Sequence, residues 1–577
     1  MSRKPRTSSS APSPPAASIS CEPAIPSRAD RLIFVGFLLW IFVSLIYPLY
    51  DTDFWWHLRT GELMLQGNAP PQVDLYTFTD SDKAWIDLHW GFQVLIAVLH
   101  RLGGVNLVIF IKAGVITAAV AIAWLASGRS LPGWLKAPLW TLPVIAISGR
   151  GYERPEMLSQ LFLAVWLFVA FRVERRPRLI WLLPAVQLLW VNCHALFVLG
   201  LVVGVCYIAD CVARDLAKGK WGLAPPARAP EGSTLIRAGG LVALACFVSP
   251  YFEEGALFPL TLYRKFTVEQ AFYSVNIGEF QQPIRFVMKY GLTNIYLIAE
   301  VGVLIMTAAS FIGVAIRRRQ WSVLRLALFV AFSHLAWEAS RNTNIFSIVS
   351  GVVLCANVGD MLAKGKLPLS PRIQGRLSCA AGLGIACLFL LVVTGQWNRW
   401  GEGNKPFALG EAKDWFIHGP AKFAGQPGFP DRAFVANNGQ AAVYSYHNYP
   451  PRTVFMDGRL EVCTLKTFKL YNEILYRMGA GDPGWQLLFD RSTAPLPAVI
   501  LDTRTSLIPL VGMMHTRGWR MVYADPSGAV FLDDASADKL HLEQVDWGLL
   551  QLKPKVAEAI RRMESEMSEG RRAKTSE

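Results

Sequence analysis

Long apolar runs alternate with short polar loops through the first two thirds of the chain. A transmembrane helix needs about 20 mainly apolar residues, with a range of about 17 to 25. The runs that approach this length are 32–50, 104–126, 132–148, 157–171, 179–191, 195–212, 235–249, 294–316, 323–337, 345–361 and 378–394. This pattern predicts a polytopic α-helical membrane protein with about eleven transmembrane helices between residues 32 and 395.

The pattern changes after residue 395. Apolar runs of strand length, at 433–436, 453–456, 499–501, 520–523 and 529–532, alternate with helix-like stretches at 439–446, 465–477 and 507–515. This alternation predicts an α/β domain with a mostly parallel sheet over 396–535. We expect 536–577 to form a charged helical or disordered tail. Residues 1–31, rich in Ser, Pro and Ala, are expected to form a disordered cytoplasmic leader.

The charge pattern orients the chain. Only 17% of the residues are charged and 52% are hydrophobic, yet the net charge is +14. In a membrane protein such an excess marks the cytoplasmic loops, so it does not indicate nucleic-acid binding. Basic residues gather in alternate loops, beginning with the leader. This distribution predicts a cytoplasmic N-terminus, a large first outside loop at 51–103 and an extracytoplasmic C-terminal domain.

The strongest chemical pattern stands at the end of the first apolar run. Asp51 and Asp53 form a D-x-D step there, and His57 follows one helical turn later. Two such acids can chelate a divalent cation such as Mg²⁺ or Mn²⁺, with His57 as a further ligand. Alternatively, one of them can act as a general base. A third interpretation is that acidic residues simply mark the membrane boundary.

Aromatic residues and a second histidine accompany this step. Trp55 and Trp56 are either anchors at the membrane interface or platforms that stack on a sugar ring. Residues 85–102 have apolar positions at three- and four-residue spacing, which predicts a helix lying on the membrane surface. Such a helix would bring His89 close to the aspartates.

Two arginines in outside loops are candidates for phosphate binding. Arg154 stands close to Glu156, and Arg341 precedes Asn342. A guanidinium group donates paired hydrogen bonds that match phosphate oxygens. The alternative for each arginine is an ion pair with a neighbouring acid.

Two further motifs leave alternatives open. Asn192 and His194, at the end of another helix, either line an outward-facing cavity or are satisfied by nearby backbone. Asp457, Gly458 and Arg459 form either a ligand-binding strand end or a tight turn with an Asp–Arg pair. We find no P-loop, zinc-protease motif or nucleophile elbow, which argues against a soluble-type NTPase, zinc protease or serine hydrolase.

Together these motifs resemble the GT-C superfamily of integral membrane glycosyltransferases, and most closely bacterial relatives of the protein O-mannosyltransferase and lipid A aminoarabinose transferase type. The resemblance is carried by Asp51, Asp53, Trp55, Trp56, His57, Gly61, Arg154, Pro155, Glu156, Trp190, Asn192, His194, Arg341, Asn342, Asp457, Gly458 and Arg459.

The resemblance implies inverting transfer of a hexosyl or pentosyl group from a polyprenyl-phosphate donor. The acceptor would be a lipid, a glycan or a protein at the outer face of the bacterial cytoplasmic membrane. Asp51 or Asp53 would then be the base or a metal ligand. Protein O-mannosyltransferases carry adjacent Asp and Glu where this chain has Asp-Thr-Asp. The resemblance therefore does not decide whether Asp51 or Asp53 has this role.

Two other functions fit parts of the pattern. A transporter or flippase of a lipid-linked or anionic substrate would use the same outward-facing cavity. Such proteins often show repeated halves, which this sequence lacks. A non-catalytic envelope scaffold would use the C-terminal domain. It would leave unexplained the polar residues of the predicted outside loops, such as Asp51, Arg154 and Arg341.

Overall fold

The computed structural model describes residues 27–561, except 129, 219–221, 224–229, 292–293, 363–368, 401–404, 490–494, 555 and 559. The expectations for residues 1–26 of the leader and 562–577 of the tail therefore lie outside the described residues. The first helix, α1, begins at Arg28, where Ser27 and Asp30 form a capping box.

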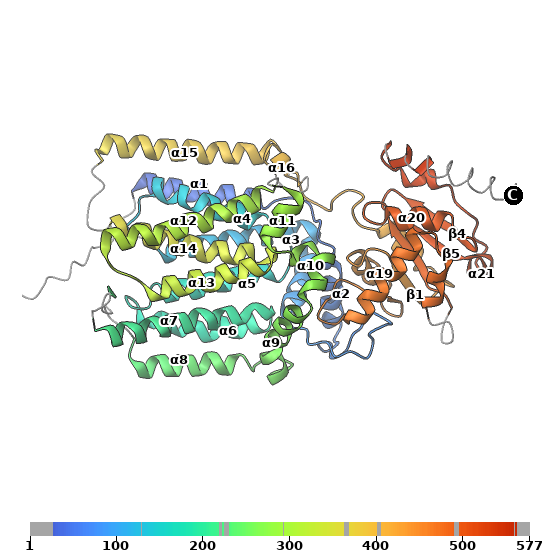
Figure 1. The fold of residues 1–577 in the computed structure, drawn as a ribbon, viewed down its shortest axis with the longest axis horizontal. Coiled ribbons are helices and arrows are strands. Elements are labelled where there is room, and N and C mark those ends of the chain that lie inside the picture. The colour runs from blue at the N-terminus through green and yellow to red at the C-terminus, as the bar shows by residue number, and fades with distance from the viewer. Residues whose placement is uncertain are drawn as a thin grey trace, which may run out of the picture.

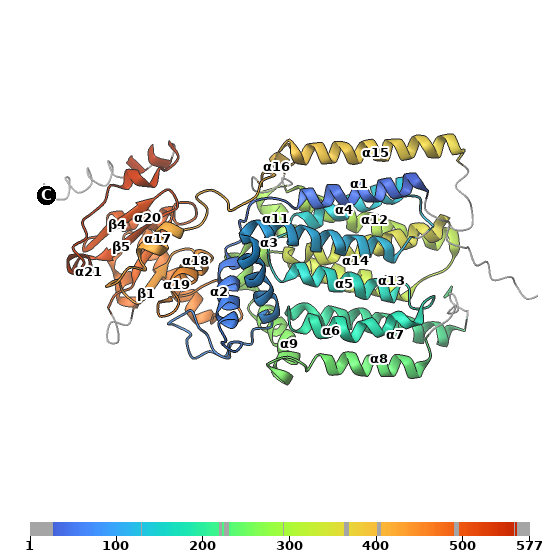
Figure 2. The ribbon, with the colours of Figure 1, turned by 180° about the vertical axis from the view of Figure 1, so that it is seen from behind.

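The helices form a bundle whose members run side by side, and the C-terminal domain lies at one end of it (Figure 1; seen from behind in Figure 2). The bundle consists of α1 (Arg28–Ser44), α3 (Trp90–Ala126), α4 (Gly133–Ser148), α5 (Glu156–Ala170), α6 (Leu182–Val191), α7 (Val198–Ala217), α8 (Gly232–Ala245), α12 (Ile295–Arg318), α13 (Val323–Glu338), α14 (Thr343–Leu362) and α15 (Pro371–Val393). Short elements lie between the bundle and the domain: α2 (Asp53–Leu65), α9 (Phe252–Val268), α10 (Gln270–Asn276), the 3-10 turn η3 (Gly278–Phe280) and α11 (Pro283–Tyr290).

Within the described residues, five helical segments are long and apolar enough to cross a membrane. They are Trp90–Ala126, Ala195–Ala217, Ile295–Arg318, Ser340–Leu362 and Pro371–Val393. Each of the eleven apolar runs in the sequence overlaps a helix of the bundle. Several of these helices are short, so length and composition alone identify fewer spans than the apolar runs predict.

The first apolar run is helical for less of its length than expected, because α1 ends at Ser44. Pro48 lacks the N–H that a continuing helix would use. Leu49 instead pairs with the segment that leads into the C-terminal domain. Its N–H donates to the carbonyl of Gly410 at 2.9 Å, and its carbonyl accepts from Ala412 N–H at 3.0 Å. The chain is therefore extended where it approaches Asp51.

Helix α3 contains most of the helix expected over residues 85–102, which begins only at Trp90, and the span that follows it. The backbone leaves helical geometry at Gly103 and Gly104, and Gly104 has φ +62°. Glycine adopts this conformation without the steric cost that a Cβ would add. The break separates Trp90 and its neighbours from the membrane-crossing part of α3.

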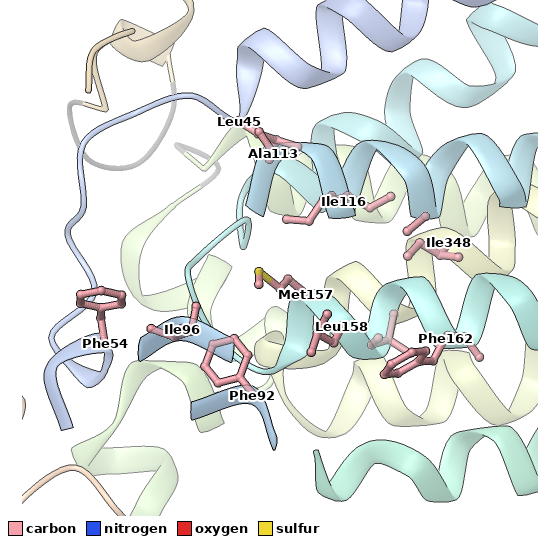
Figure 3. Close-up of a cluster of buried hydrophobic side chains, with 14 of the residues drawn as sticks. Leu45, Phe54, Phe92, Ile96, Ala113, Ile116, Met157, Leu158, Phe162 and Ile348 are labelled. Atoms are coloured by element: carbon pink, nitrogen blue, oxygen red, sulfur yellow. The ribbon is translucent and has the colours of Figure 1, made fainter. Parts of the chain in front are cut away.

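Buried apolar side chains continue from the bundle into α2 (Figure 3). Phe54 of α2 and Phe92 of α3 belong to one core cluster with Met157 of α5. Helices α2 and α3 approach closely at Gly61, where a Cβ would lie 2.1 Å from the carbonyl oxygen of Gln93. This contact fixes the helix that carries Asp53 and His57 against the bundle.

The C-terminal sheet has the strand order β2-β1-β3-β5-β4. Its strands are β1 (Arg432–Val435), β2 (Thr453–Val454), β3 (Ala498–Asp502), β4 (Trp519–Asp525) and β5 (Gly528–Asp533). Three of its helices, α18 (Gln440–Asn448), α19 (Leu465–Gly479) and α20 (Leu507–Met514), match the helix-like stretches of the sequence.

The expectation of a mostly parallel sheet is wrong for half of the strand pairs. β1 pairs in parallel with β2 and β3, whereas β5 pairs antiparallel with β3 and β4. Only Pro526 and Ser527 separate β4 from β5. A connection this short can join only antiparallel strands.

The first outside loop is docked on this sheet. Val454 of the edge strand β2 donates to the carbonyl of Tyr76 at 2.8 Å, and its own carbonyl accepts from Phe78 N–H at 3.0 Å. The loop thus continues the hydrogen bonding of the sheet at its edge. The membrane bundle and the C-terminal domain therefore meet through the segment that contains the D-x-D step.

Candidate active site

Asp51 and Asp53 lie where the extended segment turns into α2. Asp53 is the first residue of α2, where the helix dipole favours a negative charge. Its N–H donates to Asp51 Oδ1 at 3.1 Å. The two carboxylates are therefore held close together at the start of one helix.

Arg154 binds both carboxylates. It enters from the turn before α5, and its Nε and Nη2 donate to Asp51 at 2.5 and 2.8 Å. Its Nη2 also lies 3.0 Å from Asp53 Oδ2. Although burial disfavours its charged form, Asp51 and Asp53 hold the pKa of Arg154 well above its usual range. The structure thus pairs Arg154 with the D-x-D step instead of with Glu156.

The two aspartates differ in access and electrostatics. The Asp51 side chain is 2% exposed and fully engaged by Arg154, whereas that of Asp53 is 21% exposed. Burial raises the pKa of Asp53 to about 7, against the lowering effect of Arg154 and with a further rise from Asp51. Asp53 can therefore exchange a proton near neutral pH, while Asp51 is held in place beside it by Arg154.

A chain of ion pairs extends from Arg154 along the end of the bundle that faces the C-terminal domain. Glu279 of η3 lies 3.4 Å from Arg154 Nη1 and 3.2 Å from Arg150 Nη2. Glu156 lies 3.7 Å from Arg150 Nη2 and 3.6 Å from Arg341 Nη2. Burial alone would raise the pKa of Glu279, but the surrounding arginines hold it well below its usual range. Arg150 and Glu279 are site residues that the sequence motifs did not single out.

The histidines form a separate buried cluster. The ring centroids of His57 and His89 lie 5.6 Å apart, and those of His89 and His194 lie 5.4 Å apart. Burial and the neighbouring His89 hold the pKa of His57 well below its usual value. His194 Nδ1 is 2.7 Å from Ser159 Oγ. Burial and His89 thus favour the neutral form of the His57 ring.

The donor set does not fit a divalent cation in this arrangement. No group of three or more His, Cys, Asp and Glu side chains with metal-binding geometry occurs in the described part of the chain. The Arg154 guanidinium contacts both oxygens of Asp51 and Oδ2 of Asp53, which a cation bound by this pair would need. It would also repel a second positive charge at the same position.

Two expected site residues make structural hydrogen bonds. Asn192 accepts from Trp90 Nε1 at 3.0 Å and donates to the carbonyl of Val248 at 2.8 Å. Asn342 donates to the carbonyl of Leu335 at 2.8 Å. Both amides therefore hold helix ends together.

Trp55 and Trp56 are covered by protein, with exposures of 3% and 4%. Trp55 packs against residues of the C-terminal domain, including His418 at a ring-centroid distance of 4.6 Å. Trp56 packs against Trp85 of the first outside loop. Neither ring presents a free face to lipid or sugar, so both serve to dock the loop on the domain.

The Asp457–Gly458–Arg459 step forms the second half of this junction. Arg459 is 1% exposed and binds Asp457 at 2.7 Å and Asp74 of the first outside loop at 2.6 Å. Its guanidinium also lies 4.4 Å from the centroid of the Trp85 ring. The expected Asp–Arg turn is present, and its arginine reaches across to the loop.

No family description and no curated protein matches the chain. Solved structures do. The archaeal oligosaccharyltransferase AglB from Archaeoglobus fulgidus, in complex with an inhibitory peptide and a dolichol-phosphate, matches with a TM-score of 0.56 at 10% identity, over 84% of this chain and 70% of that one. The Archaeoglobus fulgidus oligosaccharyltransferase in the apo form matches with a TM-score of 0.51 at 11% identity, over 88% and 74%.

AglB is a membrane glycosyltransferase of the GT-C superfamily. The similarity extends over the bundle and into the C-terminal domain, because it covers more than four fifths of this chain. This chain therefore has the GT-C fold, and the resemblance found in its sequence motifs is confirmed at the level of the fold.

Proposed function

We propose that the protein is a membrane glycosyltransferase that uses a polyprenyl-phosphate sugar at the outer face of the bacterial cytoplasmic membrane. The observation that carries the proposal is the Asp51–Asp53 pair bound by Arg154, with the pKa of Asp53 at about 7. The GT-C fold and the dolichol-phosphate bound to AglB support a lipid-linked donor.

In the proposed reaction, Asp53 takes the proton from the acceptor nucleophile. The nucleophile attacks the anomeric carbon from the side opposite the phosphate, and the bond between that carbon and the phosphate oxygen breaks. Polyprenyl phosphate leaves with the bonding electrons, and the configuration at the anomeric carbon inverts. A base whose pKa lies near the working pH is suited to this proton transfer.

Arg154 has a positioning role in this scheme. It holds Asp51 through two hydrogen bonds and limits the position of Asp53. Arg341 is placed to meet a phosphate, because its side chain is 31% exposed and lies 3.6 Å from Glu156. Arginine on the leaving phosphate would stabilise the charge that develops there.

The proposed topology has eleven spans, a cytoplasmic N-terminus and an extracytoplasmic C-terminal domain. Alternate basic loops support it. The arrangement of the bundle is consistent with it, since the domain and the short elements α2, α9, α10 and α11 lie at the same end of the helices (Figure 1). The active site would then lie at the outer membrane boundary, away from cytoplasmic nucleotide sugars.

The test compares envelope glycans and glycolipids from cells that carry the protein, no protein, or Asp53→Asn. We expect a glycosylated product that is lost without the protein and in the variant, with the variant still present in the membrane. A suitable control is Glu254→Gln, because Glu254 is an exposed carboxylate on α9. Full product formation by Asp51→Asn, Asp53→Asn and the double variant would exclude this mechanism.

A further inference from the structure

Glu279 is the carboxylate on which the arginines of the outer face converge. It belongs to η3, the turn between the short helices α10 and α11. Arg150 lies 3.2 Å from it, and Arg154 lies 3.4 Å from it on another side. One carboxylate from a short segment outside the bundle thus lies within ion-pair distance of two arginines from the turn between α4 and α5.

The contact of Arg154 with Glu279 is looser than its contact with Asp51. Arg154 binds Glu279 at 3.4 and 3.5 Å, whereas it binds Asp51 at 2.5 and 2.8 Å. Charge-assisted hydrogen bonds of N–H to a carboxylate are usually about 2.7 to 2.9 Å long. The Nε of Arg150 is buried and has no hydrogen-bond partner among the described residues. The arginines therefore retain donor capacity that Glu279 does not use.

Glu279 can also leave. Its side chain is 33% exposed, and it is carried by a turn that is not part of the bundle. A sugar–phosphate–lipid diester has one negative charge, as a carboxylate does, so exchanging one for the other leaves the charge of the site unchanged. A phosphate group can in addition accept from several N–H donors that converge from different directions.

We propose that Glu279 occupies the binding position of the donor phosphate, and that the donor displaces it to bind Arg150, Arg154 and Arg341. This inference rests on the proposed function, whose substrate it locates. Glu279 then competes with the lipid phosphate for the arginines, and α10, η3 and α11 move when the donor enters. Arg150 becomes a phosphate ligand of the site.

Binding of farnesyl phosphate to the purified full-length protein in detergent tests the exchange. Glu279→Gln keeps the size of the side chain and removes its charge. We expect it to tighten binding by about tenfold, the gain if the carboxylate holds the arginines in about nine molecules of ten. Arg150→Gln should weaken binding, and the exposed control Glu254→Gln should leave it unchanged. Inorganic phosphate should compete only weakly, at concentrations far above that of farnesyl phosphate, because it lacks the lipid chain that contributes to binding.

Unchanged or weaker binding by Glu279→Gln, with an unchanged melting temperature, would overturn the exchange and assign Glu279 a clamping role. If Glu279→Gln lowers the melting temperature, Glu279→Asp serves as the second variant. It shortens the carboxylate and should also tighten binding, whereas weaker binding would overturn the proposal. If Glu279→Gln binds farnesyl phosphate more tightly but no sugar transfer is found, the proposed glycosyltransferase function is wrong and the phosphate site stands. If the protein transfers sugar but no variant binds farnesyl phosphate, the phosphate site is wrong and the proposed glycosyltransferase function stands.

Discussion

Gly458 of the C-terminal domain lies against the carboxylate of Asp53. A Cβ at residue 458 would be 2.9 Å from Asp53 Oδ1. The neighbouring Arg459 is anchored to Asp74 of the first outside loop at 2.6 Å. The C-terminal domain therefore forms one wall of the candidate active site, next to its proposed base.

Replacement of Gly458 by Ala should slow transfer by about 100-fold, because a displacement of the base by about 1 Å has an effect of this size. The added methyl group would push the Asp53 carboxylate away from its position beside Arg154. The measurement is the rate of product formation in membranes at matched protein levels. Gly382→Ala on α15 is the matched control, since a Cβ there meets nothing within 4 Å. Equal rates of product formation for Gly458→Ala and Gly382→Ala would show that Gly458 does not fix the position of Asp53.

The rate of transfer should rise with pH and level off above about 7, the value to which burial raises the pKa of Asp53. The base must be deprotonated to act, so activity falls about tenfold for each unit below that pH. The measurement is the pH profile of the rate at saturating acceptor. A profile that is flat between pH 5 and pH 8, or one that falls as pH rises, would exclude Asp53 as the base.

Loss of Arg154 should move this profile toward higher pH. Arg154 lowers the pKa of Asp53 by stabilising the carboxylate, whereas burial and Asp51 raise it. Without the guanidinium the midpoint for Arg154→Gln should lie above 7, in addition to any general loss of rate. The midpoint is the informative readout, because a purely structural defect lowers the rate without shifting it. A midpoint at lower pH would show that Arg154 does not act on Asp53.

Removal of the Arg459 charge should loosen the junction between domain and bundle. Arg459→Met leaves Asp74 and Asp457 buried without their cation, which typically costs about 3 to 5 kcal/mol. We expect a lower melting temperature and faster proteolysis of the segment between α15 and β1. The triple variant with Asp74→Asn and Asp457→Asn should recover part of the loss. Unchanged proteolysis in Arg459→Met would show that the junction does not depend on this ion pair.

The helices could be located from the sequence because apolar runs are local patterns. The apolar runs at 323–337 and 345–361 correspond closely to α13 and α14. The same holds in the C-terminal domain, where the run at 499–501 is the centre of β3. The end of the first run was misjudged, because the extended geometry before Asp51 depends on pairing with Gly410 and Ala412.

The residues that make up the candidate site were harder to predict from the sequence. The D-x-D step was recognisable because only Thr52 separates Asp51 from Asp53 in the chain. Glu279 has no motif around it, and only the fold brings it beside Arg154. Both interpretations of Trp55, as a membrane anchor or as a sugar platform, left its ring facing lipid or ligand. The ring packs instead against His418, which lies far away in the sequence. Contacts of this kind depend on tertiary packing, which local patterns do not encode.

The position of Gly458 beside Asp53 has a consequence for biosynthesis. In the proposed topology Asp53 lies in the first exported segment, whereas Gly458, which forms the wall beside it, is translated much later. An unfinished chain in the membrane therefore has its base but no completed site. If the protein is the enzyme and has the topology proposed above, a growing chain transfers no sugar until the domain that carries Gly458 has been exported and folded.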